Sequence, residues 1–236
     1  MRFAVVAVSF LLLWALNASA ADFVDEATRI RFPDAIAVVA NEPAPTTCDA
    51  GTLALCRGPV RRYPDPGLGI GLSYSLGGNL VTASVFIYDL GESGFPDGPG
   101  SGIVARQYDA MKDEIRSMET LADYRNVRLL GEGAGETTSI GPLKARAAHF
   151  SYERGGRPFI SDAYLSALKG KLLKVRVTYR ADVDAAKASS ERFMKELGAL
   201  ITEALGSRSA NRCTSRLTRG GFSVCPTREA ARSSTS

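Results

Sequence analysis

Apolar and polar residues alternate along residues 68–89, the period of two that β-strands show when one face is buried. The two alternating runs are separated by Gly77-Gly78, and glycine reaches the positive φ of a tight turn at little cost. The pattern predicts a β-hairpin. We expect Gly69 and Gly71 to lie within its first strand, on a small face against which a helix packs closely.

The same hairpin begins with a glycine-rich stretch, residues 66–79, that invites comparison with a phosphate-binding loop. Such a loop needs its glycines where a strand passes into a helix, so that backbone N–H groups and the helix N-terminus face the anion. Here the glycines lead into a second strand. The sequence therefore argues against a nucleotide-binding loop.

A helical period replaces the alternation in two places. In residues 103–121 apolar residues recur at spacings of three and four, and Ser101 precedes them as a candidate N-cap. The members of this stripe are Val104, Tyr108, Met111, Ile115 and Met118. A second helix is expected from Asp182 to Leu205, ended by Gly206. Both helices should pack against a sheet.

Four strand-like runs lie between the two helices, at residues 124–130, 141–152, 159–168 and 171–179. The segments between them are rich in turn-forming residues, and short connections favour an antiparallel meander. Two shorter β-prone runs, residues 28–32 and 35–40, come before the loop-rich segment 41–66.

Strands and helices in separate blocks predict an α+β fold, with an antiparallel β-sheet of about six strands packed by two main helices. Over residues 68–206 this order, a hairpin before the first helix and a long closing helix, resembles the PsbP-like α/β/α sandwich. The resemblance implies an accessory or assembly module that binds other proteins, sometimes with a metal. It transfers no binding residue, because it rests on element order.

Residues 1–20 have the layout of a secretory signal peptide: Arg2, an apolar run, and small residues before a cleavage site expected after Ala20. The apolar run is shorter than the roughly 20 residues of a membrane-spanning helix. We therefore expect a periplasmic or secreted protein. Residues 21–206 should form a single domain and residues 207–236 an Arg/Ser-rich tail.

The four cysteines, Cys48, Cys56, Cys213 and Cys225, all follow the predicted signal peptide. An even count in an oxidising compartment indicates two disulfides, for which three pairings exist. We favour Cys48–Cys56 and Cys213–Cys225, because each pair is close in sequence. Neither spacing matches a zinc site, so no metal and no cofactor is expected.

The net charge of +4 belongs to the tail, since residues 207–236 hold six of the 29 Lys and Arg residues and one of the 25 acids. Such a tail can make weak contact with an anionic membrane surface. Because the protein is expected to be exported, nucleic acid is not an expected partner.

Candidate chemistry is sparse. The single histidine, His149, lies in a strand-like run, where a half-buried structural role is the simpler interpretation. The motifs G-x-S-x-G and H-E-x-x-H are absent, so no catalytic residue is assigned. Asp89, Glu92 and Asp97 flank a Gly/Pro-rich loop, where loop carboxylates could form a recognition surface or attract calcium weakly.

Basic residues also alternate on two of the predicted strands. Arg146 and Arg176, with Lys144 and Lys174, would form a positive stripe if these strands were neighbours, although charged outward faces are ordinary for an exposed sheet. The binding candidates are therefore Asp89, Glu92, Asp97, His149, Arg146 and Arg176.

These observations favour an exported, non-enzymatic binding or accessory module for a protein or envelope component. The alternative is a periplasmic ligand-binding protein or hydrolase with an atypical carboxylate-based site that includes His149. A deep pocket at His149 or at the 89–97 loop would favour this alternative.

Overall fold

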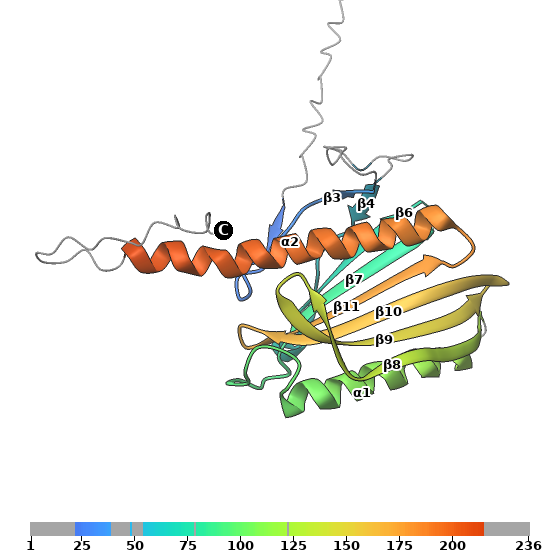
Figure 1. The fold of residues 1–236 in the computed structure, drawn as a ribbon, viewed down its shortest axis with the longest axis horizontal. Coiled ribbons are helices and arrows are strands. Elements are labelled where there is room, and N and C mark those ends of the chain that lie inside the picture. Colours follow the sequence, from blue (N-terminus) through green and yellow to red (C-terminus); the bar gives the residue numbers. More distant parts are fainter. Residues whose placement is uncertain (1–21, 39–47, 49–53, 78, 122, 215–236) are drawn as a thin grey trace, which may run out of the picture.

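The protein is built around a nine-stranded sheet with one helix on each face (Figure 1). The computed structural model describes residues 22–38, 48, 54–77, 79–121 and 123–214, without the side chains of 132–137 and 207–214. The strand order is β3-β4-β6-β7-β11-β10-β9-β8, with β5 beside β6, and all the pairs are antiparallel. The predicted α+β class with two main helices is confirmed.

The elements have the following bounds. The strands of the large sheet are β3 Ala35–Ala37, β4 Ala54–Arg57, β5 Arg61–Arg62, β6 Ile70–Leu76, β7 Val81–Tyr88, β8 Tyr124–Ile140, β9 Leu143–Arg154, β10 Arg157–Leu168 and β11 Lys171–Arg180. A separate small sheet pairs β1 Phe23–Val24 with β2 Arg31–Phe32. The helices are α1 Gly102–Ser117 and α2 Asp184–Thr214, and two 3-10 turns are η1 Pro66–Leu68 and η2 Met118–Thr120.

The predicted number of about six strands is wrong. The meander and the hairpin supply β6 to β11, as expected, but β3, β4 and β5 extend the sheet beyond β6. Two of these come from segment 41–66, which the sequence indicates as irregular. Because prolines and glycines interrupt this segment, its short strand-forming runs do not stand out in the sequence. These runs form β4 and β5 because they lie beside the open edge of β6.

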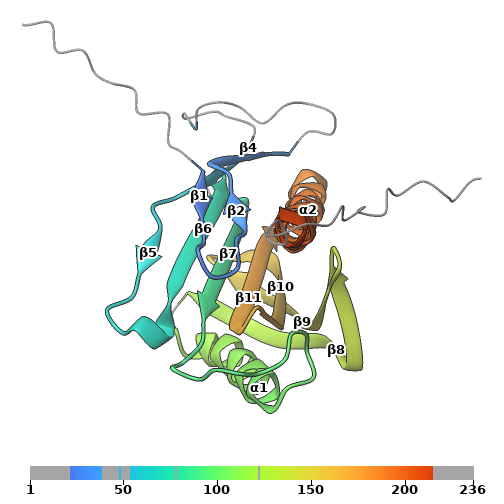
Figure 2. The same ribbon diagram turned by 90° about the vertical axis from the view of Figure 1, so that its left-hand side faces the viewer.

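The two helices are offset from each other across the sheet (Figure 2). Helix α2 packs over β6, β7 and β11, where the rings of Tyr74 and Phe193 lie 5.4 Å apart. Helix α1 packs on the opposite face, against β8 to β11, and buries Val104, Met111 and Ile115 there. Each helix therefore covers only part of its face.

The predicted start and apolar stripe of α1 are confirmed. The Ser101 side chain accepts a hydrogen bond from the Val104 N–H, as an N-cap does. The Tyr108 hydroxyl, at the centre of the stripe, donates to the carbonyl of Ala147 on β9. A buried tyrosine usually finds such a partner, and this one ties the helix to the sheet.

Two predicted boundaries are wrong for a common reason, which is that isolated glycines do not end elements by themselves. Helix α2 continues through Gly206 to Thr214, at a cost of only about 1 kcal/mol for glycine in a helix. Strand β8 runs through the segment 131–139, which turn-forming residues suggested as a loop. Its pairing with β9 shifts register there, so the extra residues are taken up as bulges.

The hairpin of β6 and β7 is confirmed, but the expected role of its glycines is not. Gly69 precedes β6 and caps η1 at φ +60°, and a Cβ there would lie 1.9 Å from the carbonyl oxygen of Ile87. A Cβ on Gly71 would meet the Phe86 ring at 3.2 Å. The close neighbour is therefore strand β7 and not a helix. Gly78 lies outside the described residues.

One further close approach joins α2 to the sheet. Gly141, in the turn between β8 and β9, faces Gly198 of α2, and a Cβ on Gly198 would lie 2.7 Å from the Gly141 nitrogen. Only glycine permits this contact on both sides. None of the described helices combines the length and apolar character needed to cross a membrane.

Candidate functional site

Polar and aromatic side chains gather on the α2 side of strands β9 and β10, where they remain partly exposed. We call this surface the His149 face and define it by His149, Ser151, Ile160, Asp162 and Tyr164. The side chain of His149 is 46% exposed and that of Asp162 19% exposed. Ser151, Ile160 and Tyr164 are half-buried.

Strand register brings these residues together. Asp162 lies opposite His149, Ile160 opposite Ser151 and Tyr164 opposite Ala147. Asp162 also lies opposite Val177 of β11, which belongs to the core under α2. Because alternate residues of a strand share a face, all five residues of the His149 face point to the α2 side of the sheet.

His149 and Asp162 form a hydrogen-bonded pair at the centre of this face. His149 Nδ1 lies 2.7 Å from Asp162 Oδ1. An ionised carboxylate only accepts hydrogen bonds, so Nδ1 carries the proton and donates it. The ring of Tyr164 meets the imidazole edge-on, with centroids 6.4 Å apart. The carboxylate thus orients the imidazole and leaves Nε2 for a ligand or partner.

Two tyrosines keep neutral hydroxyls near this pair. Burial raises the pKa of Tyr164 far above its ordinary value, and the Asp162 charge adds to the effect. Burial also raises the pKa of Tyr179, with smaller contributions from Asp162 and Glu191. Both side chains therefore remain protonated hydrogen-bonding groups beside the Asp162 carboxylate.

A histidine and an aspartate in contact are two of the three parts of a nucleophilic triad. Ser151 shares their face, yet no hydrogen bond joins its hydroxyl to His149 in the described part of the chain. The hydroxyl of Ser161 belongs to the other face, where it contacts the Thr178 hydroxyl at 2.9 Å and accepts from Arg176 Nε at 2.8 Å. The geometry therefore suits binding better than acyl transfer.

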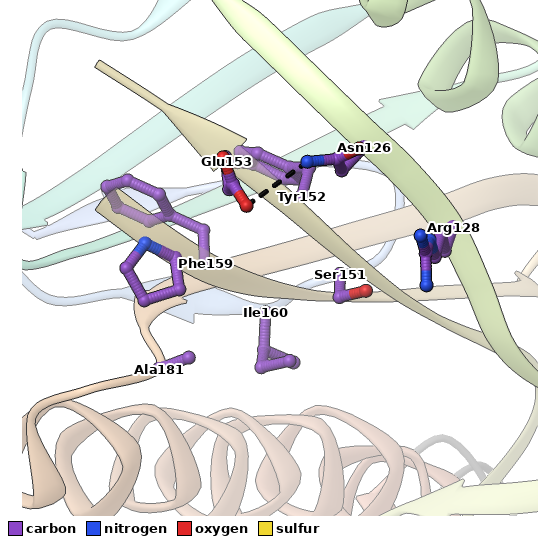
Figure 3. Close-up of a pocket in the computed structure, with 9 residues that line it drawn as sticks. Asn126, Arg128, Ser151, Tyr152, Glu153, Phe159, Ile160 and Ala181 are labelled. Carbon is purple, nitrogen blue, oxygen red and sulfur yellow. Dashed lines mark hydrogen bonds between the residues drawn. The ribbon is translucent and has the colours of Figure 1, made fainter. Parts of the chain in front are cut away.

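A pocket of about 290 Å³ continues the His149 face toward the end of β9 and the start of β10 (Figure 3). Its lining includes Asn126, whose amide donates to Glu153 Oε1 at 3.1 Å, and apolar atoms of Ile160 and Ala181. Arg128 of β8 contributes a positive charge and makes no ion pair within the described residues. The pocket offers charged, aromatic and aliphatic groups in one place.

The predicted acidic cluster does not converge. The Asp89 carboxylate accepts hydrogen bonds from Lys171 and from the Gly91 N–H. Glu92 pairs with Arg106 at 3.1 Å, and Asp97 accepts from the backbone N–H of Lys169. Within the described residues no group of three or more metal-ligating side chains forms. The three acids thus hold separate parts of the loop.

The condition for a positive stripe is not met, because β10 lies between β9 and β11. Arg146 and Arg176 both point to the α1 side. Arg146 Nε donates to the Pro99 carbonyl at 3.1 Å, and its guanidinium lies 5.7 Å from the Tyr108 ring. Arg176 contacts Met118 as well as Ser161. Both arginines support the packing of α1 and the loop before it.

The predicted disulfide between Cys48 and Cys56 is confirmed, with its Cα atoms 5.7 Å apart. It closes the segment that precedes β4 and ties it to the sheet. The predicted Cys213–Cys225 pair, the signal peptide and most of the tail lie outside the described residues.

Comparison with known proteins adds little. No protein-family model matches the chain, and no curated protein matches its sequence. One similar solved structure is LpqN, described as involved in cell envelope biogenesis of Mycobacterium tuberculosis. The similarity covers 56% of this chain and 75% of that chain, at 16% identity and a TM-score of 0.30. A likeness this weak carries no argument about function, and it does not confirm the PsbP-like resemblance.

Proposed function

We propose that this protein is an exported binding module that recognises a protein or envelope component through the His149 face. The observation that carries the proposal is the Asp162–His149 pair, held at 2.7 Å with the His149 side chain 46% exposed. An oriented imidazole with a free Nε2 offers a directional hydrogen bond to a partner.

The composition of the surrounding surface supports this role. Tyr164 and Arg128 belong to residue types enriched at interfaces, and Ile160 adds apolar surface beside them. Tyrosine brings a large contact area at small entropic cost, since it has few rotatable bonds. A partner that covers this face would bury these side chains together with the pocket beside them.

Export is part of the proposal. The signal-peptide layout of residues 1–20 and the Cys48–Cys56 disulfide both fit an oxidising compartment such as the periplasm or the extracellular space. One helix on each face of an antiparallel sheet is also the layering that a PsbP-like α/β/α sandwich requires. We propose that likeness for the fold, together with the accessory role it implies.

The alternative, a ligand-binding protein or hydrolase with a carboxylate-based site, receives less support. Cavities among the described residues include one beside β3, one beside β8 and one at the β9–β10 turn. Neither His149 nor the loop of residues 89–97 lines any of these cavities. The His149 face is thus better suited to a macromolecular partner than to a small enclosed substrate.

Site-specific photo-crosslinking in the native host tests the proposal. A photoreactive residue at position 160 should give one discrete adduct, whereas the same residue at Ser75, exposed on the other side of the sheet, should not. Asp162→Asn, which keeps the side-chain shape but removes the charge that orients His149, should reduce the adduct from position 160. Equal labelling from positions 160 and 75, or an adduct that Asp162→Asn leaves unchanged, would contradict the proposal.

A further inference from the structure

Three arginines surround a second cavity at the end of the sheet where three sequence-distant segments meet. The cavity has a volume of about 540 Å³. Gly77, Asn79 and Leu80 of the β6–β7 turn line it together with the β9–β10 turn and the end of β11. The arginines are Arg154, Arg157 and Arg180.

The β9–β10 turn places two of these positive charges directly opposite each other. Arg154 and Arg157 are cross-strand partners, and like charges in that position destabilise a hairpin. Neither residue makes an ion pair with a described residue, and the charges of Asp123 near Arg154 and of Asp182 near Arg157 act only at longer range. Two unmatched positive charges therefore face one cavity.

Two of the three arginines, Arg154 and Arg180, are held in place by neighbouring side chains and keep donors free. The Arg154 guanidinium lies 5.0 Å from the Phe159 ring, and its Nη1 donates to the Tyr124 hydroxyl at 3.5 Å. Arg180 uses Nε and Nη2 to bind both oxygens of Asp182, at 2.7 and 2.6 Å. An arginine has five N–H donors, so the side chains of Arg154 and Arg180 are positioned and still available.

We propose that this cavity binds a phosphate group carried on an apolar or aromatic moiety. Planar guanidinium groups match the geometry of phosphate oxygens in a bidentate manner. The two positive charges of Arg154 and Arg157, which form no ion pair with a described residue, balance the two negative charges of a phosphate monoester dianion. Phe159 and Leu80 provide an apolar wall for the group attached to the phosphate. Such a group could come from a soluble phosphate ester or from a phospholipid headgroup.

Binding measurements on the protein purified as its host processes it test this site. Calorimetric titration with inorganic phosphate and with phenyl phosphate should show binding of both, with phenyl phosphate bound more tightly. Arg157→Gln, at an exposed turn position, should weaken binding about tenfold, the loss expected for a hydrogen bond to a charged group. Arg157→Lys should retain part of the affinity, because it keeps the charge.

Arg61→Gln is the matched control, since Arg61 is exposed on β5, opposite Gly71 at the far end of β6. Sedimentation with vesicles of phosphatidylglycerol and phosphatidylcholine separates the two sources of phosphate. Binding to vesicles in addition to phenyl phosphate, lost in Arg157→Gln and kept in Arg61→Gln, would assign a lipid headgroup. Binding to phenyl phosphate with the same pattern but without vesicle binding would assign a soluble ester.

Two results would overturn the proposal. One is the absence of binding to any of these probes by the wild-type protein. The other is binding that Arg157→Gln and Arg61→Gln reduce equally or not at all. Vesicle binding that survives Arg157→Gln would belong to the basic tail and not to this cavity. Crosslinking from position 160 does not depend on this outcome, because phosphate binding and partner binding are measured separately.

Discussion

Replacing Gly198 of α2 by alanine tests how closely this helix approaches the sheet. The new Cβ would lie 2.7 Å from the nitrogen of Gly141 and 3.0 Å from its Cα. Ordinary contact begins near 3.4 Å, so the backbones must separate by about 0.7 Å. Gly141 has a φ of +58°, a left-handed conformation that glycine adopts at little cost and that other residues rarely adopt.

The magnitude follows from two opposing effects. Forcing extra volume into a packed contact costs about 1–3 kcal/mol. Alanine gains about 1 kcal/mol over glycine inside a helix. Gly206→Ala provides the matched control, because Gly206 lies in the same helix and a Cβ there has no atom within 4 Å. The difference between the two variants therefore isolates the contact.

Equilibrium urea denaturation, followed by circular dichroism at the helical band, measures this difference. We expect Gly206→Ala to raise the unfolding midpoint slightly and Gly198→Ala to lower it, with a gap of about 1–3 kcal/mol in unfolding free energy. Circular dichroism is preferable to tryptophan fluorescence, because the single tryptophan lies within the predicted signal peptide. Equal stabilisation of the two variants would refute the close approach of α2 to the β8–β9 turn.

Two other predictions concern local stability. Reduction of Cys48–Cys56, a crosslink with a sequence separation of 8, should lower the free energy of unfolding by about 2.5 kcal/mol in the chain-entropy account; an unchanged denaturation midpoint with and without reductant would contradict it. Burial acts to raise the pKa of Asp89, but hydrogen bonds from Lys171 and the Gly91 N–H outweigh it, so the pKa lies below its ordinary 3.8. A lowered folded pKa stabilises the protein above pH 3.8, and this contribution is lost as the pH falls further. Asp89→Asn should flatten that part of the stability profile, and an unaltered slope would argue against the ion pair.

The sequence predicts best those elements whose pattern is both long and regular. The stripe of α1 and the Ser101 cap follow from spacing and local chemistry, and both are present in the structure. The ends of α2 and β8 cannot be predicted from the sequence pattern, because a helix tolerates glycine and a strand accommodates extra residues as bulges. Whether a glycine ends an element depends on packing that lies elsewhere in the chain.

The pairing of Asp162 with His149 can in principle be predicted from the sequence. Gly155-Gly156 forms a two-residue turn, which places Arg154 opposite Arg157 and, counting back along both strands, His149 opposite Asp162. Without this strand register, no partner of His149 can be identified from the sequence. The arginine cavity is harder to predict from the sequence. Asn79 and Arg180 reach it from β-strands whose order only the folded sheet establishes.

The bulges of β8 have a further consequence for the behaviour of the protein in solution. Strand β8 pairs with β9 alone and so forms one border of the sheet, with register shifts around residues 126, 130 and 133–136. A regular border strand would present an unbroken row of N–H and C=O groups to the border strand of another molecule. The register shifts in β8 interrupt this row and so disfavour edge-to-edge aggregation. The same residues made the strand look like a loop in the sequence.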